Sequence, residues 1–184
     1  MSKEEHILDI AESLFNEFGY NAVGVDLIRD KANVSKTSMY RYFGSKNKLI
    51  ESMLIRRHKR FEEELNTVVF ATKGTENKLN AILDWHFSWF RSADFQGCLF
   101  MHALAEFKGH DELIVKQAQR HKTWLKSLLS SIFSANQTEA EIKTEALMTF
   151  IEGMIVRAEF DEMTGHEEIY RRSAKMLASM CFLS

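Results

Sequence analysis

Side chains that can form hydrogen bonds gather early in the chain, over residues 36–46. They are Lys36, Thr37, Ser38, Tyr40, Arg41, Tyr42 and Lys46. Hydroxyl and basic groups of this kind bond the edges of nucleic-acid bases and the phosphates beside them. The sequence shows no nucleophile elbow, no zinc-binding motif and no phosphate-cradling glycine loop. We therefore expect binding rather than catalysis, and no cofactor.

Two short helices are predicted to position these side chains. Val25–Ala32 reads as one helix, and Asn33 tolerates the left-handed conformation that turns the chain. Ser35 is a good N-cap for a second helix, Lys36–Phe43, and a long helix starts at Lys46. Two helices joined by a tight turn form a helix-turn-helix, whose second helix enters a DNA major groove about 12 Å wide. Val34, Met39 and Phe43 are expected on its buried side.

The spacing of residues across the first 50 positions is more specific than a generic helix-turn-helix. An amphipathic helix ends in Leu14-Phe15…Phe18-Gly19-Tyr20, and then follow Val25…Ile28, Val34-Ser35-Lys36, Tyr40, Tyr42-Phe43, Ser45-Lys46 and Leu49. This pattern resembles the tetracycline-repressor (TetR) family of bacterial transcription regulators. The resemblance implies a dimer of Ω-shaped subunits. Each has a three-helix DNA-binding head, a linking fourth helix and a divergent helical body that holds an effector pocket.

The resemblance also implies roles for single residues. Lys36, Thr37 and Arg41 are assigned to base edges, and Tyr42 and Lys46 to phosphates. For Tyr40 two interpretations stay open: a side chain that contacts DNA, or a ring packed within the head. Three positions depart from the family pattern: Gly24 stands where a Ser or Thr cap is usual, Asn33 where glycine is usual, and Arg29 where alanine is usual. Arg29 must point outward or reach a phosphate, or the geometry of the head is in doubt.

Composition and hydrophobic periodicity predict an all-α fold of about nine helices. The 184 residues include no proline and only 8 glycines, which disfavours a β-sandwich or barrel. Apolar residues at helical spacing continue after the head and predict helices near 76–92, 98–108, 111–134, 138–162 and 166–182. We expect a DNA-binding domain over 1–46 and an effector-binding and dimerisation domain over 47–184. With two cysteines, no signal-peptide pattern and no long apolar run, the expectation is a cytoplasmic protein with no membrane partner.

Charge is distributed unevenly along the chain. Residues 29–60 carry ten basic side chains and two acidic ones, whereas the whole chain has a formal charge of −2. A basic segment beside an acidic body suggests that a polyanion binds near one end. The alternative is a solvated helix face.

Aromatic and sulfur-containing side chains in the second half suggest where an effector binds. The tentative pocket consists of Trp85, His86, Trp89, Phe90, Met101, His102, Trp124, Phe150 and Met154. For any one of these residues, membership of the core is the simpler interpretation. His102, Glu106 and His110 have the spacing of metal ligands on one helical face, but Gly109 is expected to end that helix first, so no metal site is predicted.

Two further hypotheses concern the body. The last two helices are rich in apolar residues, which are expected either to pair with a second copy or to be buried within one chain: Leu147, Phe150, Ile151, Met154, Ile155, Ile169, Met176, Leu177 and Met180. Cys98 follows Gly97 at the start of a predicted helix, as in one branch of the TetR family. A thiol at a helix N-terminus can sense oxidants or electrophiles, although a small buried residue is the plainer interpretation. Cys181 is interpreted as a core residue of the last helix.

The sequence thus favours a ligand-responsive, sequence-specific DNA-binding regulator. We expect a homodimeric repressor that a small-molecule effector releases from a palindromic operator. The alternatives are an all-helical small-molecule-binding or interaction protein with a degenerate head, or a redox sensor of the same fold based on Cys98.

Overall fold

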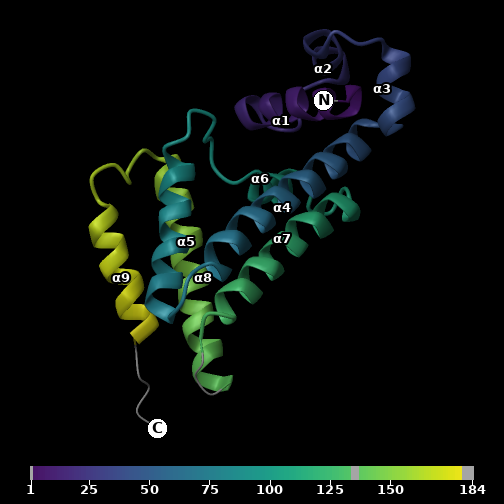
Figure 1. The fold of residues 1–184 in the computed structure, drawn as a ribbon. Helices are drawn as coiled ribbons and strands as arrows, with labels where there is room; N and C mark the ends of the chain where they lie inside the picture. Colours follow the sequence, from purple (N-terminus) through teal and green to yellow (C-terminus); the bar gives the residue numbers. More distant parts are fainter. Residues whose placement is uncertain (1, 134–136, 180–184) are drawn as a thin grey trace. The chain divides into compact units, whose positions relative to one another are not determined.

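The chain folds entirely into helices and connecting turns over the residues that the structure describes. A computed structural model describes residues 2–133 and 137–179. Within those two ranges there are nine helices and no strand. Figure 1 labels the helices in chain order. They are α1 (Lys3–Phe18), α2 (Val25–Ala32), α3 (Lys36–Phe43), α4 (Lys46–Phe70), α5 (Thr75–Phe90), α6 (Leu99–Phe107), α7 (Glu112–Ser130), α8 (Gln137–Glu159) and α9 (Glu167–Ser179). The prediction of an all-α fold is confirmed.

The predicted helix boundaries agree closely with the observed ones. The ranges predicted for α2 and α3 are those observed, and the starts of α4 to α9 fall within a residue of prediction. The predicted ends of the last helix, with Met180 and Cys181, and of the helix predicted over 111–134 lie outside the described residues. No helix in the described part of the chain is long and apolar enough to cross a membrane.

Packing divides the chain into two compact units. The first comprises Met1–Arg60 and Cys98–His121, and the second comprises Phe61–Gly97 and Lys122–Ser184. Helices α4 and α7 each contribute residues to both units. The division predicted from function, at residue 46, is a different one and stays a prediction.

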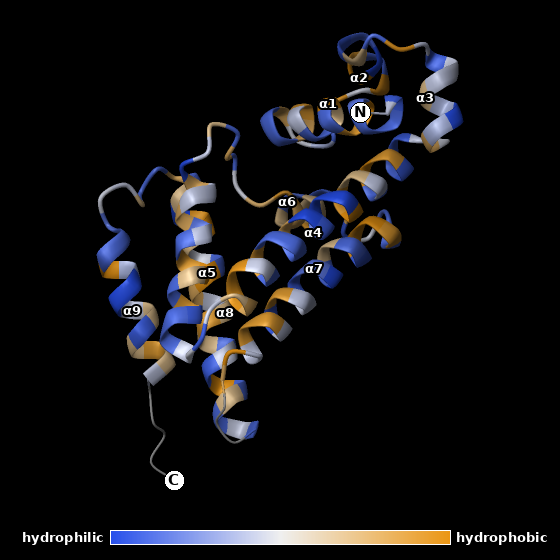
Figure 2. Ribbon diagram, in the orientation of Figure 1, coloured by the Kyte–Doolittle hydropathy of each residue, from blue (hydrophilic) through white to orange (hydrophobic). Residues whose placement is uncertain are grey.

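The first unit contains the N-terminal helices and α6. Its core includes Ile7, Phe15, Ile28 and Leu54, all of them fully buried. In Figure 2 the visible turns of α1 and α4 carry both hydrophobic and hydrophilic residues, as expected of helices with one buried side. Tyr20 is buried in the same unit, with its ring 5.0 Å from that of Phe15.

The second unit is built on α5, α8 and α9. Helix α9 packs against both α5 and α8. Four apolar residues of α8 are buried within this single chain: Leu147, Ile151, Met154 and Ile155. These four therefore do not form a surface for a second copy, because α8 has neighbouring helices that cover them. The exposed apolar residues near the end of α8 and on α9 are different ones, Val156, Phe160, Ile169 and Met176.

Candidate nucleic-acid interface

The turn between α2 and α3 has the geometry that the sequence predicts. Asn33 ends α2 in the left-handed conformation, with φ of 52°, and its amide donates to carbonyl oxygens of Arg29 and Asp30. Ser35 then caps α3 by accepting a hydrogen bond from the amide of Ser38 at 3.1 Å. Gly24 starts α2 without a side-chain cap, as expected for a glycine. Two helices are thus joined by a three-residue turn.

Helix α3 has one buried and one exposed face. Met39 and Phe43 are 3% and 8% exposed and attach the helix to the rest of the unit. Lys36, Thr37 and Arg41 are exposed. Helical spacing puts Thr37 and Arg41 on the side away from Met39 and Phe43, and Lys36 at the edge of the buried side. A helix held by one apolar face presents the opposite face at a fixed angle, which groove recognition requires.

Tyr40 and Tyr42 lie in different environments. Tyr40 is 46% exposed, so it is not a fully packed core ring. Tyr42 is half-buried, with its ring centroid 6.2 Å from that of Phe43. The guanidinium of Arg41 lies 5.3 Å from the Tyr42 ring centroid, a cation–π contact that orients both side chains.

Lys46 starts α4, next to the cap that Ser45 provides by accepting from the amide of Lys48. Lys46 is half-buried, and it helps line a small hollow with Tyr40 and Ser45. Burial lowers the pKa of Lys46, while the charge of Glu106 acts in the opposite direction. The ammonium group is therefore partly desolvated, and the negative charge of Glu106 on α6 favours its charged form.

Two predicted contacts have neighbours that the sequence did not suggest. The hydroxyl of Ser38 accepts a hydrogen bond from the hydroxyl of Ser35 at 3.0 Å, so this side chain is part of the helix cap. The Nζ atom of Lys36 lies 3.8 Å from a carboxylate oxygen of Asp26, across the turn. The roles of Lys36 and Ser38 on DNA stay predictions.

Arg29 points outward, which resolves the doubt that its size raised. Its guanidinium donates to Asp26 at 3.0 Å and to Asp30 at 2.6 Å and 2.8 Å. Hydrogen bonds to Asp30 raise the pKa of Arg29 above its ordinary value. This side chain therefore forms an ion-pair group on the surface of α2 and does not disturb the head.

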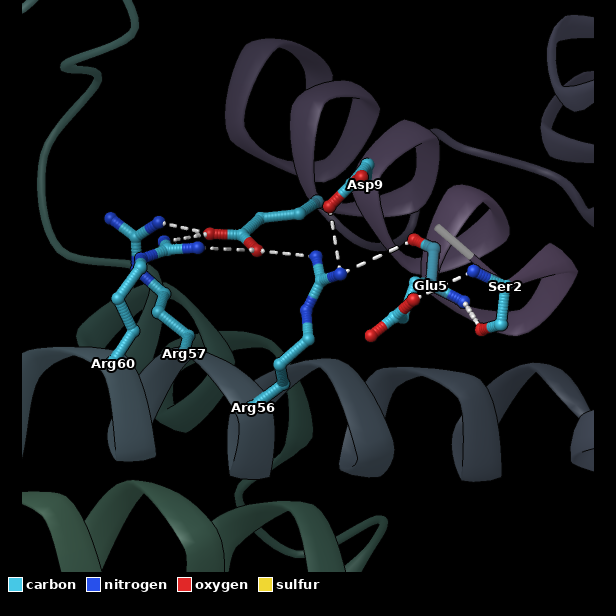
Figure 3. Close-up of polar contacts among 7 residues, drawn as sticks. Ser2, Glu5, Asp9, Arg56, Arg57 and Arg60 are labelled. Carbon is cyan, nitrogen blue, oxygen red and sulfur yellow. Dashed lines mark hydrogen bonds and ion pairs between the residues drawn. The ribbon is translucent and has the colours of Figure 1, made fainter.

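The basic segment of residues 29–60 is not one continuous anion-binding surface. The guanidiniums of Arg56, Arg57 and Arg60 all donate to the carboxylate of Glu12 on α1, at 3.0, 2.5 and 2.6 Å. Arg56 also pairs with Asp9 at 2.7 Å. Figure 3 shows the three arginines of α4 directed toward α1. The net positive charge of residues 29–60 therefore overstates the surface available to an anion, because three of its arginines are paired with Glu12 and hold α1 against α4.

The tentative effector residues are only partly brought together. In the second unit, α5 and the end of α4 supply a group of neighbouring rings. The ring centroids of Trp85 and Trp89 on α5 are 5.8 Å apart, and that of Phe61 on α4 lies 4.9 Å from Trp85 and 5.2 Å from Trp89. The ring of His86 lies 6.1 Å from that of Phe90. The indole N–H of Trp85 donates to the carboxylate of Glu64 at 2.9 Å, a contact that the sequence did not suggest.

The remaining tentative effector residues are more scattered. Trp124, Phe150 and Met154 also belong to the second unit, and the ring of Phe150 lies 5.9 Å from that of Tyr170. Met101 and His102 belong to the first unit, and Met101 is exposed. A common pocket for the whole set stays a prediction.

Glu106 has a role that the sequence pattern did not reveal. Its two carboxylate oxygens accept hydrogen bonds from the backbone amides of Tyr20 at 2.9 Å and Asn21 at 2.7 Å. The spacing with His102 and His110 suggested a metal ligand or a polar group of the pocket. The observed partners lie more than 80 residues away, and no local pattern identifies them.

Cys98 is the N-cap residue of α6 and is 4% exposed. Its position at the helix start agrees with the sequence prediction. A reagent would reach this thiol only after the surrounding residues move, so the hypothesis of a redox sensor stays a prediction without support from exposure.

Taken together, the left-handed turn, the capped short helix and its exposed polar face define a helix-turn-helix unit of the kind found in DNA-binding proteins. A sequence model described as "Bacterial regulatory proteins, tetR family" matches residues 7–53, which include all of α2 and α3. The chain is 32% identical over 91 residues to the HTH-type transcriptional activator FasR of Mycolicibacterium smegmatis. That match covers 50% of this chain and 41% of FasR, so it spans less than half of the relative's length.

Solved structures show the same fold over nearly the whole chain. A TetR-family transcriptional regulator from Streptomyces coelicolor gives a TM-score of 0.89 at 18% identity, covering 96% of this chain and 94% of that one. NemR from E. coli in its reduced form gives a TM-score of 0.81 at 20% identity, covering 96% and 97%. At these identities the likeness concerns the fold. The N-terminal segment thus matches the TetR family model, and the described part of the chain has the fold of the TetR-family structures.

Proposed function

We propose that this chain is a sequence-specific transcriptional regulator that binds a palindromic DNA operator as a homodimer, in the cytoplasm. We further propose that it is a repressor, which a small-molecule effector releases from the operator. The proposed DNA-contacting residues are Lys36, Thr37, Ser38, Tyr40, Arg41, Tyr42 and Lys46.

The observation that carries this proposal is the division of α3 into two faces. Met39 and Phe43 are buried, and Lys36, Thr37 and Arg41 are exposed on a helix only eight residues long. Their polar groups suit the donor and acceptor pattern of the major groove. The half-buried Lys46 and Tyr42 at the end of this segment suit phosphate contacts, which set the register of the protein on DNA.

The homodimer is supported by the apolar residues that the second unit leaves exposed. Val156 and Phe160 are four residues apart, at and just after the last turns of α8, and Ile169 and Met176 are seven residues apart on α9. Each spacing places both members of a pair on one face of a helix. Two heads one helical turn of DNA apart read two half-sites, which accounts for the proposed palindrome.

The effector is proposed on the ring group of α5. Binding sites for small molecules are mostly apolar with a few polar groups, and Trp85, Trp89 and Glu64 supply both kinds of surface. Helix α4 belongs to both compact units, so a change of its tilt is the proposed link between effector and head. The effector shifts DNA binding only if its affinity differs between the two states.

The test begins with selection of bound duplexes from a random pool by the purified protein, followed by titration at two salt concentrations. We expect a recovered palindrome whose affinity falls steeply with salt. Lys36→Ala combined with Lys46→Ala is expected to weaken binding by at least about tenfold, because a base contact and a phosphate contact are lost. Lys116→Ala, an exposed lysine of α7, is the matched control and should leave binding unchanged. Unchanged DNA affinity in the double variant would refute the proposed interface.

Repression is tested separately with a reporter gene whose promoter contains the recovered operator. A repressor lowers expression of the reporter when the protein is produced. An increase in reporter expression would instead indicate a transcriptional activator, as FasR is named.

A further inference from the structure

The carboxylate of Glu106 binds the turn that leads into the helix-turn-helix. Helix α1 ends before Gly19, and the next two amides, of Tyr20 and Asn21, donate to the two different oxygens of Glu106. An ionised carboxylate that accepts two backbone N–H groups makes charge-assisted bonds, which are about twice as strong as neutral ones. Helix α6 thereby holds the backbone of the turn directly.

Gly19 shows that this approach is close. Its φ is +79°, and a Cβ added at this position would lie 3.3 Å from the Oε1 atom of Glu106. A side chain here is therefore disfavoured by backbone conformation and by the nearness of the carboxylate. The turn and the carboxylate fit one another over three consecutive residues, Gly19 to Asn21.

Tyr20 connects the same turn to the other end of α6. Its hydroxyl donates to the carbonyl oxygen of Leu99 at 2.9 Å, and its ring lies 5.6 Å from that of Phe107. Tyr20 is fully buried, and burial raises its pKa well above the ordinary value, so the hydroxyl stays a donor. The first and last residues of α6, Leu99 and Phe107, thus both contact the residue that follows the end of α1.

The charge of Glu106 also acts on Lys46. Lys46, the first residue of α4, is half-buried and feels the negative charge of Glu106. One side chain of α6 therefore influences the segment before α2 and the proposed phosphate contact after α3.

We propose that Glu106 is a positioning residue for DNA recognition, which fixes the Gly19–Asn21 turn and so sets the orientation of α2 and α3. This inference rests on the proposed DNA-binding function. Glu106 itself touches no DNA in this proposal. It acts because α2 starts four residues after the turn and packs against α3, so a displaced turn displaces the face that enters the groove.

The test uses the full chain and the operator duplex recovered by selection. Glu106→Gln keeps the size of the side chain and one acceptor oxygen but removes the charge and the second acceptor. We expect affinity for the operator to fall by about tenfold, the effect of losing one charge-assisted hydrogen bond. Glu106→Asp retains both acceptors and the charge on a shorter side chain, and we expect it to recover part of the affinity.

The matched control is Glu17→Gln, which removes the same charge from an exposed position near the end of α1. Loss of a negative charge alone should leave DNA binding unchanged or make it slightly tighter, because DNA is a polyanion. If Glu106→Gln behaves like Glu17→Gln, the carboxylate acts only as a charge and the inference is wrong.

Amide hydrogen exchange separates positioning from general stability. In Glu106→Gln we expect faster exchange at the amides of Tyr20 and Asn21, with unchanged exchange in the middle of α1 and in α4. The inference would be overturned if exchange became faster throughout the first unit, or if the exchange rates of the Tyr20 and Asn21 amides did not change. A wild-type protein that selects no duplex refutes the proposed function instead, so the two failures are distinguishable.

Discussion

At the scale of single residues, the most constrained charge in the first unit is the carboxylate of Glu12. Burial raises its pKa, but hydrogen bonds and charges from Arg60 and Arg57 outweigh burial and hold the pKa of Glu12 below its ordinary value of 4.5. Asp9 adds a second negative charge beside Arg56. The buried guanidinium of Arg57 is acceptable in the interior only because the carboxylate of Glu12 is present. Arg56 and Arg60 are also paired with Glu12, so the three arginines contribute little to any surface that binds DNA.

Glu12→Gln is therefore expected to destabilise the first unit by about 3–5 kcal/mol at neutral pH, because three guanidiniums lose their shared counter-ion. The sign with pH follows from the lowered pKa. The stabilising contribution of Glu12 is complete above 4.5 and is lost as the pH falls through its lower value in the folded protein. Urea unfolding of both proteins at a series of pH values should show the difference shrinking below pH 4.5. The exposed Glu17→Gln serves as control, and a pH-independent difference contradicts the prediction.

The buried His86 should make the stability of the second unit depend on pH as well. Burial lowers the pKa of His86 to about 4, and its Nδ1 lies 2.8 Å from the carbonyl oxygen of Ile82, which fixes the neutral Nδ1–H form. The unfolded chain takes up a proton below the ordinary value of 6.5, whereas the folded chain does not, so stability falls as the pH is lowered from 6.5 toward 4. The total loss is roughly 3 kcal/mol. His86→Phe should remove this slope in thermal or urea unfolding, and the exposed His166→Ala should retain it.

At the scale of elements, α3 depends on its N-cap because an isolated eight-residue helix is not stable in water. Ser35→Ala removes the acceptor for the Ser38 amide and is expected to cost about 1 kcal/mol. We expect faster amide exchange at the start of α3 and weaker operator binding than in wild type. Ser13→Ala, at an exposed position inside α1, should leave both measurements unchanged. Equal exchange in Ser35→Ala and wild type would show that packing alone maintains this helix.

The boundaries of α2 and α3 were predictable because their signals are local. The amide of Asn33 donates to carbonyl oxygens, and the hydroxyl of Ser35 accepts from an amide, all no more than four residues away, so the sequence around them carries the information. The partners of Glu106 and Glu12 were not predictable, since they lie 85 and 45 residues away along the chain. The same dependence on distant partners explains the error about the basic segment. Composition counts Arg57 as a free positive charge, and only the tertiary structure shows that Arg57 is paired with Glu12.

The apolar residues of the last two helices show the same limit at a larger scale. Periodicity identified amphipathic helices, but it does not say which apolar residues face the same chain. In the structure Leu147 and Ile151 are fully buried within the chain, whereas Ile169 and Met176 are 61% and 70% exposed. The surface proposed to contact a second copy therefore consists of exposed residues at the end of α8 and on α9, and not of the residues in the buried core.

At the scale of the whole molecule, this surface predicts the oligomeric state. Placing charge on both exposed α9 positions, Ile169→Glu with Met176→Glu, should separate the proposed homodimer into monomers, because two carboxylates per chain would be buried without a partner. Sedimentation equilibrium measures the mass directly. Leu113→Glu, an equally apolar exposed position on α7, is the control and should remain dimeric.

The same variant also tests whether dimerisation supports DNA recognition. A monomer contacts one half-site, so the affinity for the full palindrome should fall and the dependence of binding on salt should become about half as steep, since half of the phosphate contacts are lost. Binding to an isolated half-site should be unchanged, because α3 is not altered. A dimeric double variant would exclude this face of α9 from the interface. A monomeric variant that retains full affinity for the palindrome would show that one head recognises the operator alone.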